Sequence, residues 1–435
     1  MNKILYAFIA SLVLLVSCTP DDSDVMYADS DKYTSKQMRS PKRGVCFNNL
    51  YEADFTVMNA GISWTYNWAA AGYNATLADV AAKTKIEYFP MIWNGGGEAQ
   101  IRKYKQEHPE CMYILAFNEP NLTDQANMTP AQAAAKWAPV KTLAQELNMK
   151  IVAPAMNYGT LAEYGDPIKW LDEFFAQPGV SIDDVDALAL HCYMNVPSAL
   201  KSYVERFRKY NKPVWMTEFC AWEGEVSVDK QREYMCDVLN YFESDPFIER
   251  YSWFKYDGST TANPRYGLRP AGNYKGELSE LGKIYVYLSS LDKELHYTHN
   301  QVIPGEHYSN CNASEAVETS KFTSGPQLKV SSDVTGILEV TNFGLPKWAE
   351  YKIAPVVKGD YHLIIRYASS GDSKIKISIN DQEIRELDLP KTGSYTNWET
   401  ITTPVVPLKA GKQTIRITPS KGMISLNWWR YKRER

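Results

Sequence analysis

The sequence has no surplus of basic residues and no closely spaced pair of cysteines. Its 47 lysines and arginines are balanced by 51 aspartates and glutamates, for a formal net charge of −4. This excludes the basic surface of a nucleic-acid-binding protein. The six cysteines beyond residue 18 form no CxxC pair, which argues against a zinc cluster, and several stand in apolar runs where buried free thiols are usual. The glycines at 95–97 do not fit a phosphate-binding loop.

The N-terminus lacks an apolar run long enough for a confident membrane-spanning helix. Residues 4–16 form an apolar run that follows a lysine, and the segment ends in Leu15-Val16-Ser17-Cys18. This is typical of a signal peptide, which we expect over residues 1–17. The ending resembles a bacterial lipobox, which implies cleavage before Cys18 and lipid attachment to its thiol. The acidic residues 21–24 resemble the export signal of Bacteroidetes surface lipoproteins, so we expect an exported, outer-membrane lipoprotein at the cell surface. The alternative is a plain secretory signal.

The rest of the chain divides into three parts after a polar tether over residues 18–41. From 42 to 292, eight short apolar runs alternate with helix-like stretches, which predicts an α/β fold of the (β/α)8 TIM-barrel type. Residues 293–313 are polar and are expected to form a linker. From 314 to 435, apolar and polar residues alternate between turn signals, which predicts an all-β antiparallel β-sandwich of the jelly-roll kind.

Polar and aromatic side chains stand where the predicted barrel strands end. They are Asn48, Trp68, Trp93, Asn94, Asn118, Glu119, Asn157, His191, Tyr193, Glu218 and Trp253. The carboxyl ends of barrel strands meet at the mouth where such enzymes hold their active site. The sequence therefore predicts one site assembled from distant segments.

Two glutamates in this set suggest hydrolysis of a glycosidic bond. Glu119 follows the fourth run and Glu218 ends the seventh, 99 residues apart. The reaction needs one carboxyl group to protonate the leaving oxygen and a second to act at the anomeric carbon, with no cofactor. Burial is expected to raise the pKa of the acid. The alternative is that each glutamate is a structural carboxylate paired with a barrel lysine or arginine.

Other residues of the set are candidates for substrate binding. Asn118 could bond the hydroxyl beside the reacting carbon, or cap a turn. His191 and Tyr193 are expected to flank Glu218. The tryptophans Trp64, Trp68, Trp93 and Trp253 could stack on sugar rings, with Trp253 as the floor of the cleaved unit, or each could belong to the core. Asn48, Asn94 and Asn157 complete the predicted binding set.

Several motifs resemble known carbohydrate-active families. Asn118-Glu119-Pro120 and Thr217-Glu218-Phe219 are similar to clan A retaining glycoside hydrolases. More narrowly, residues 42–44, 63–68, 89–93 and 152–155 resemble glycoside hydrolase family 128. This resemblance implies an endo-β-1,3-glucanase with Glu119 as acid/base and Glu218 as nucleophile.

The C-terminal region resembles a family 6 carbohydrate-binding module through residues 348–351, 359–361, 392–398 and 426–429. This resemblance implies Tyr395 as one sugar-binding aromatic. Such modules often hold a structural calcium ion, for which no ligands can be assigned. The expected partner of the whole chain is a β-glucan, bound by a monomer. Two alternatives remain open, a surface glycan-binding lipoprotein without catalysis and a clan A enzyme acting on mixed-linkage glucan, β-mannan or xylan.

Overall fold

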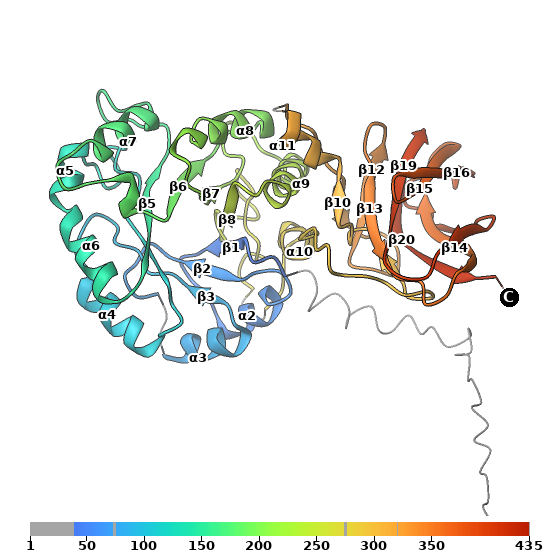
Figure 1. The fold of residues 1–435 in the computed structure, drawn as a ribbon, viewed down its shortest axis with the longest axis horizontal. Helices are drawn as coiled ribbons and strands as arrows, with labels where there is room; N and C mark the ends of the chain where they lie inside the picture. The colour runs from blue at the N-terminus through green and yellow to red at the C-terminus, as the bar shows by residue number, and fades with distance from the viewer. Residues whose placement is uncertain (1–38, 73–74, 274–275, 320, 435) are drawn as a thin grey trace, which may run out of the picture.

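The computed structural model describes residues 39–434 except 73–74, 274–275 and 320. The predicted signal peptide, the lipidation site Cys18 and most of the tether lie outside the described residues. Figure 1 shows a barrel on one side and an all-β domain on the other. In the part of the chain that is described, no helix is long and apolar enough to cross a membrane. The six cysteines there are all buried free thiols, as expected.

The N-terminal part is a TIM-like barrel. Its parallel strands are β1 (Arg43–Cys46), β2 (Trp64–Tyr66), β3 (Glu87–Tyr88), β4 (Tyr113–Leu115), β5 (Lys150–Met156), β6 (Ala187–Cys192), β7 (Val214–Phe219) and β8 (Ile248–Trp253). They run in the order β3-β2-β1-β8-β7-β6-β5-β4. A parallel bridge between Met91, three residues after β3, and Leu115 of β4 joins the two ends of the sheet and completes the ring. The predicted TIM-barrel fold is thus supported as a TIM-like barrel.

Helices cover the outside of the strands. They are α2 (Glu52–Met58), α3 (Ala75–Thr84), α4 (Glu98–Glu107), α5 (Pro130–Ala135), α6 (Trp137–Glu146), α7 (Pro167–Phe175), α8 (Pro197–Glu205), α9 (Val228–Ser244) and α10 (Glu280–Tyr287). Local sequence sets several of their starts. Thr129 caps α5 before Pro130, and Asp166 caps α7 before Pro167, because a side-chain oxygen accepts an otherwise unpaired N–H while proline needs none.

The C-terminal part consists of two antiparallel sheets. Its elements are β9 (Ile303–Pro304), β10 (Asn310–Cys311), α11 (Glu315–Thr319), β11 (Gln327–Val330), β12 (Leu338–Gly344), β13 (Ala349–Ile353), β14 (Gly359–Ala368), β15 (Ser373–Ile379), β16 (Gln382–Leu389), β17 (Glu399–Thr402), β18 (Val406–Leu408), β19 (Gln413–Lys421) and β20 (Met423–Arg433). One sheet has the order β10-β13-β19-β15-β16 and the other β11-β12-β20-β14-β17. The arrangement fits a β-sandwich, while the jelly-roll connectivity stays a prediction.

The predicted linker over residues 293–313 needs correction. Within it, β9 pairs with β20 and β10 pairs with β13. A polar segment without periodicity can still supply short strands when its backbone completes the edge of a sheet. This segment therefore belongs to the C-terminal domain.

The two domains share a buried interface. Helices α9 and α10 contact β11 and β12. Asn240 of α9 is fully buried, accepts a hydrogen bond from Tyr308 Oη at 2.8 Å and donates one to the carbonyl of Pro326 at 3.0 Å. Buried amides need such partners, so these bonds fix how the domains meet.

At the start of the barrel, Arg43 joins β1 to the helices beside it. Its buried guanidinium bonds Glu243 Oε1 at 3.0 Å, Tyr251 Oη at 2.8 Å and four carbonyls between residues 285 and 289. A buried charge is tolerated when it is fully paired in this way. The motif around Arg43 therefore has a structural role at the end of the barrel away from the glutamates.

Candidate active site

Glu119 and Glu218 lie at the same end of the barrel. Glu218 stands within β7, whereas Glu119 follows β4 and is held by a backbone bond from its N–H to the carbonyl of Ala155 on the neighbouring β5. Both side chains are buried, with 6% and 4% of each residue exposed. Glu119 has a φ of 44°, in the left-handed region that a residue with a side chain adopts only at a cost. Such strain is typical of functional positions.

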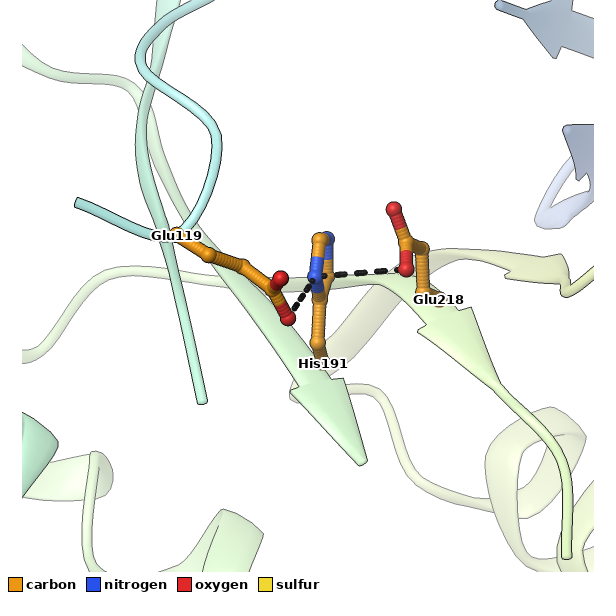
Figure 2. Close-up of side chains that lie close together, drawn as sticks. All are labelled: Glu119, His191 and Glu218. Atoms are coloured by element: carbon orange, nitrogen blue, oxygen red, sulfur yellow. Dashed lines mark hydrogen bonds and ion pairs between the residues drawn. The ribbon is translucent and has the colours of Figure 1, made fainter. Parts of the chain in front are cut away.

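A buried histidine stands between the two glutamates (Figure 2). His191 Nδ1 lies 2.8 Å from Glu119 Oε1 and 3.4 Å from Glu218 Oε2. One carboxylate oxygen of each glutamate and the imidazole nitrogen all lie within 4.8 Å of one another. His191 Nε2 is buried with no hydrogen-bond partner among the described residues, so the ring acts through Nδ1.

Glu218 is surrounded by hydrogen-bond donors. Tyr66 Oη at 3.2 Å and Trp68 Nε1 at 2.7 Å donate to its Oε1, and Tyr193 Oη donates to its Oε2. An indole N–H can only donate, so these donors favour the ionised carboxylate against the effect of burial.

The protonation of the three central groups is coupled. Burial raises the pKa of Glu218, and the charge of Glu119 raises it further against the opposing effect of His191 and the donors. Burial would also raise the pKa of Glu119, but the charge and hydrogen bond of His191 and a bond from Asn157 lower it overall. Although burial opposes it, the two carboxylates raise the pKa of His191. The expected rise in the pKa of Glu119 is therefore wrong in direction, because His191 contacts it directly.

Two asparagines lie beside Glu119. Asn157 Nδ2 donates to Glu119 Oε1 at 3.1 Å, and its contact with substrate stays a prediction. Asn118 donates to Gln125 Oε1 at 3.2 Å, while its own Oδ1 is buried without a partner among the described residues. A buried oxygen without a donor is costly, and a substrate hydroxyl could supply that donor.

Two of the predicted sugar platforms are corrected. Trp64 is fully buried, and its ring packs on Phe89 and Trp215 inside the barrel. Trp253 is also fully buried, and it donates to the carbonyl of Tyr266. Neither indole ring can meet a substrate, because each already fills the core.

The other predicted residues lie around the glutamates or at the rim. Trp68 and Tyr193 contact Glu218 as described. Trp93 is half-buried and Asn48 and Asn94 are exposed. In the described part of the chain, none of these three hydrogen-bonds either glutamate.

Sequence reasoning missed Tyr66 and Phe254. Tyr66 lies two residues before Trp68, so the period of two along a strand could have indicated that both point inward. The half-buried ring of Phe254 lies 5.9 Å from Trp68 and 5.4 Å from Tyr193, centroid to centroid. Phe254 follows Trp253 directly, so the aromatic ring that packs on Trp68 and Tyr193 is one position further along the chain.

Glu119, His191 and Glu218 could also hold a metal ion, since each offers one ligand atom. Two carboxylates and one imidazole suit a transition metal such as zinc. Among the described residues this is the one group of three or more His, Cys, Asp or Glu side chains close enough to share an ion, and the calcium ion expected in the C-terminal domain stays a prediction.

Comparison with known proteins agrees with this geometry. The family described as glycosyl hydrolase catalytic core matches residues 44–285, more than half of the chain. The chain belongs to this family and is a glycoside hydrolase. It is 35% identical to a GH128 (subgroup II) endo-β-1,3-glucanase from Pseudomonas viridiflava, over 57% of this chain and 98% of that one, with a TM-score of 0.53. The resemblance to family 128 in the sequence motifs is thus supported.

Two further relatives match a similar share of this chain. A GH128 (subgroup II) endo-β-1,3-glucanase from Sorangium cellulosum is 33% identical over 56% of this chain and 97% of that chain, with a TM-score of 0.49. Alkali-sensitive linkage protein 1 of Schizosaccharomyces pombe is 27% identical over 261 residues, 57% of this chain. The match covers 44% of that curated relative's length.

The C-terminal domain is similar to a different module from the one expected. Residues 326–431 match a carbohydrate binding module of family 35, which corrects the family 6 resemblance. The motifs that suggested family 6 include Tyr351, Tyr361 and Trp429, all fully buried. These residues specify a sandwich core rather than a sugar cleft. Tyr395 is half-buried between β16 and β17, and its sugar contact stays a prediction.

Proposed function

We propose that the protein is a retaining endo-β-1,3-glucanase. The observation that carries this is the buried pair Glu119 and Glu218 joined through His191, in a chain 35% identical to an endo-β-1,3-glucanase over nearly all of that enzyme. The substrate class is a β-1,3-glucan such as laminarin.

The separation of the carboxylates supports retention of anomeric configuration. Oxygens of Glu119 and Glu218 lie within 4.8 Å of each other. Retaining enzymes place the two carboxyl groups about 5–5.5 Å apart, whereas inverting enzymes keep about 6.5–9.5 Å for an intervening water. The short gap between the oxygens of Glu119 and Glu218 supports the retaining arrangement.

The surroundings of each glutamate support its role. Glu218, ionised among its donors, attacks the anomeric carbon and becomes a glycosyl ester. Glu119 passes to the departing oxygen the proton that it shares with His191, and then takes one from the water that releases the sugar. The unpartnered Oδ1 of Asn118 accepts a hydrogen bond from the hydroxyl beside the reacting carbon.

Reducing-sugar release from laminarin tests the activity, with mixed-linkage glucan, β-mannan and xylan as competing substrates. The wild type should release a range of laminari-oligosaccharides, as internal cleavage does. Glu218→Gln should leave almost no turnover, and EDTA should not change the rate. Loss of activity in EDTA would indicate metal chemistry at the same three residues, and preference for another glycan would overturn the linkage.

Products formed with azide separate the two roles. Glu119→Ala should lose about 10²–10⁴-fold on laminarin, less on aryl glycosides with good leaving groups, and should give a β-glycosyl azide. Glu218→Ala should give the α-azide, because azide attacks from the vacated face. The α product from Glu119→Ala would reverse the assignment.

The other parts of the proposal concern location and attachment. The lipobox-like ending supports acylation of Cys18, export to the outer membrane and display at the cell surface. Cys18→Ala should then release the protein from membranes.

The similarity to a family 35 module supports carbohydrate binding by the C-terminal domain, which laminarin pull-down of a Tyr395→Ala variant tests. Sedimentation of the purified protein tests the expected monomer.

A further inference from the structure

Asn121 is a buried asparagine two residues after Glu119, the proposed acid. Its side-chain nitrogen donates to the carbonyl of Asn157 at 2.7 Å and to that of Tyr164 at 3.3 Å. Only the nitrogen of an amide can donate to two carbonyl oxygens, so the partners of Asn121 determine how its side chain is oriented. The side chain thus ties the segment after β4 to the segment after β5.

The backbone of Asn121 reinforces this connection. Its carbonyl accepts the N–H groups of Thr160 and Leu161 at 3.1 and 3.0 Å. Gly159 lies directly against Asn121, since a Cβ atom there would overlap the same carbonyl oxygen and the side-chain nitrogen. Asn121 therefore holds the segment after β5 near its start, in its middle and near its end.

The first residue held in this way, Asn157, contacts the acid. Its Oδ1 accepts from the N–H of Tyr158 at 2.8 Å, which leaves its amide nitrogen to donate to Glu119 Oε1 at 3.1 Å. His191 Nδ1 lies 2.8 Å from the same oxygen. A donor in this place keeps the carboxyl group of Glu119 pointed at the histidine. Such support matters, because displacing a catalytic group by about 1 Å can cost roughly a hundredfold in rate.

Building on the proposed function, we propose that Asn121 is a positioning residue for the acid/base Glu119. In the described part of the chain, the hydrogen bonds to the carboxyl group of Glu119 come from His191 and Asn157, so Asn121 acts on it through Asn157. Without the amide of Asn121, the carbonyl of Asn157 loses this donor, and its bond to Glu119 is held less firmly. Both proton transfers of Glu119 then slow, whereas the attack by Glu218 does not.

Two substrates separate proton transfer from the rest of catalysis. Laminarin needs a proton on its departing oxygen, whereas the leaving group of dinitrophenyl β-laminaribioside departs without one. Asn121→Ala should lower kcat/KM on laminarin about tenfold, a part of the roughly 10²–10⁴-fold that acid–base catalysis supplies, and leave kcat/KM on the aryl glycoside unchanged. On that glycoside kcat and KM should fall together, because release of the sugar from Glu218 still needs Glu119 as base.

A double-mutant cycle tests the route through Asn157. In the background of Asn157→Ala, adding Asn121→Ala should cause little further loss on laminarin, because both changes break the same connection. Thr123→Val is the matched control. Thr123 joins the same two segments through Thr160 Oγ1, at 3.0 Å, and not through Asn157. This variant should leave the kinetics on both substrates unchanged.

Three results would contradict the proposal. An equal loss of kcat/KM on both substrates would mean that Asn121 supports only the fold. Additive losses in the cycle would mean that it acts without Asn157, and an equal effect of Thr123→Val would assign the role to the segment as a whole. If Asn121→Ala does not fold, Asn121→Ser gives the same comparison with a smaller expected loss, because its hydroxyl group can still donate to one carbonyl. A wild type inactive on both substrates would instead overturn the proposed function.

Discussion

Glu306 is a buried carboxyl group that should make stability depend on pH. It lies between β9 and β10 with 1% of the residue exposed, and its Oε2 has no hydrogen-bond partner among the described residues. Burial raises its pKa to about 8. In the unfolded chain the group ionises near pH 4.3, so between these values the folded protein holds a proton that the unfolded one has released.

The size of the effect follows from the shift in pKa. Each pH unit between about 4.3 and 8 lowers the stability by roughly 1.4 kcal/mol, or about 5 kcal/mol over the interval. Glu306→Gln keeps the shape of the protonated acid and cannot ionise. The variant should match the wild type at pH 4 and become progressively more stable towards pH 8.

Thermal unfolding in EDTA at pH 4, 6 and 8 measures this difference, with the chelator removing any bound divalent ion. The melting temperature of Glu306→Gln should exceed that of the wild type by several degrees at pH 8. An equal difference at every pH, or a variant less stable at pH 8, would refute the reasoning that Glu306 stays protonated in the fold.

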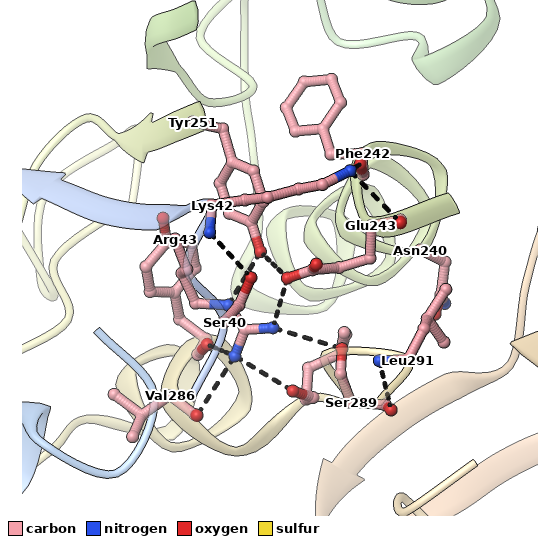
Figure 3. A network of polar contacts seen from close by, with 12 residues as sticks. Ser40, Lys42, Arg43, Asn240, Phe242, Glu243, Tyr251, Val286, Ser289 and Leu291 are labelled. Atoms are coloured by element: carbon pink, nitrogen blue, oxygen red, sulfur yellow. Dashed lines mark hydrogen bonds and ion pairs between the residues drawn. The ribbon is translucent and has the colours of Figure 1, made fainter. Parts of the chain in front are cut away.

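Three further changes test the active site, the domain interface and the end of the barrel. His191→Asn should shift both limbs of the pH profile of kcat/KM on laminarin to higher pH, because His191 lowers the pKa of both catalytic carboxyl groups. Limbs at the same pH as in the wild type would contradict this. Asn240→Ala should lower the free energy of unfolding by about 2–4 kcal/mol, because it leaves Tyr308 Oη and the carbonyl of Pro326 buried without partners. Urea titration measures this loss, and an unchanged free energy of unfolding would mean that the interface relaxes. Arg43→Met should lower the free energy of unfolding by about 3–5 kcal/mol in the same titration, because it removes the guanidinium that pairs with the buried Glu243 in Figure 3. A loss below about 1 kcal/mol would contradict the importance of this ion pair.

The barrel and its two glutamates were predictable because strand ends carry a strong local signal. An apolar run followed by a carboxylate marks the mouth of a parallel barrel in the sequence itself. The direction of each aromatic ring was not predictable in this way. Trp253 packs on Phe219 and Tyr285 in the core, while Phe254, the next residue, turns towards the site. An error of one position reverses the face, because neighbouring residues of a strand point in opposite directions.

The boundary between the domains also could not be predicted from the sequence. The segment around β9 and β10 is polar and has no period, as a linker would be. It becomes structured because Tyr308 reaches Asn240 of α9 and because its backbone pairs with β13 and β20. Contacts between residues 68 positions apart leave no local pattern.

The protonation of Glu119 and Glu218 is the property that the sequence could predict least. His191 is the register neighbour of Glu218 on adjacent strands, so the sequence assigned it to that residue. Its nitrogen nevertheless lies nearer to Glu119, by 2.8 against 3.4 Å. The residue predicted as acid is therefore the one that the imidazole keeps ionised, and the proton needed by the leaving group lies in the hydrogen bond between His191 and Glu119. Which carboxyl the imidazole pairs with more closely depends on the difference between 2.8 and 3.4 Å, which only the packed barrel determines.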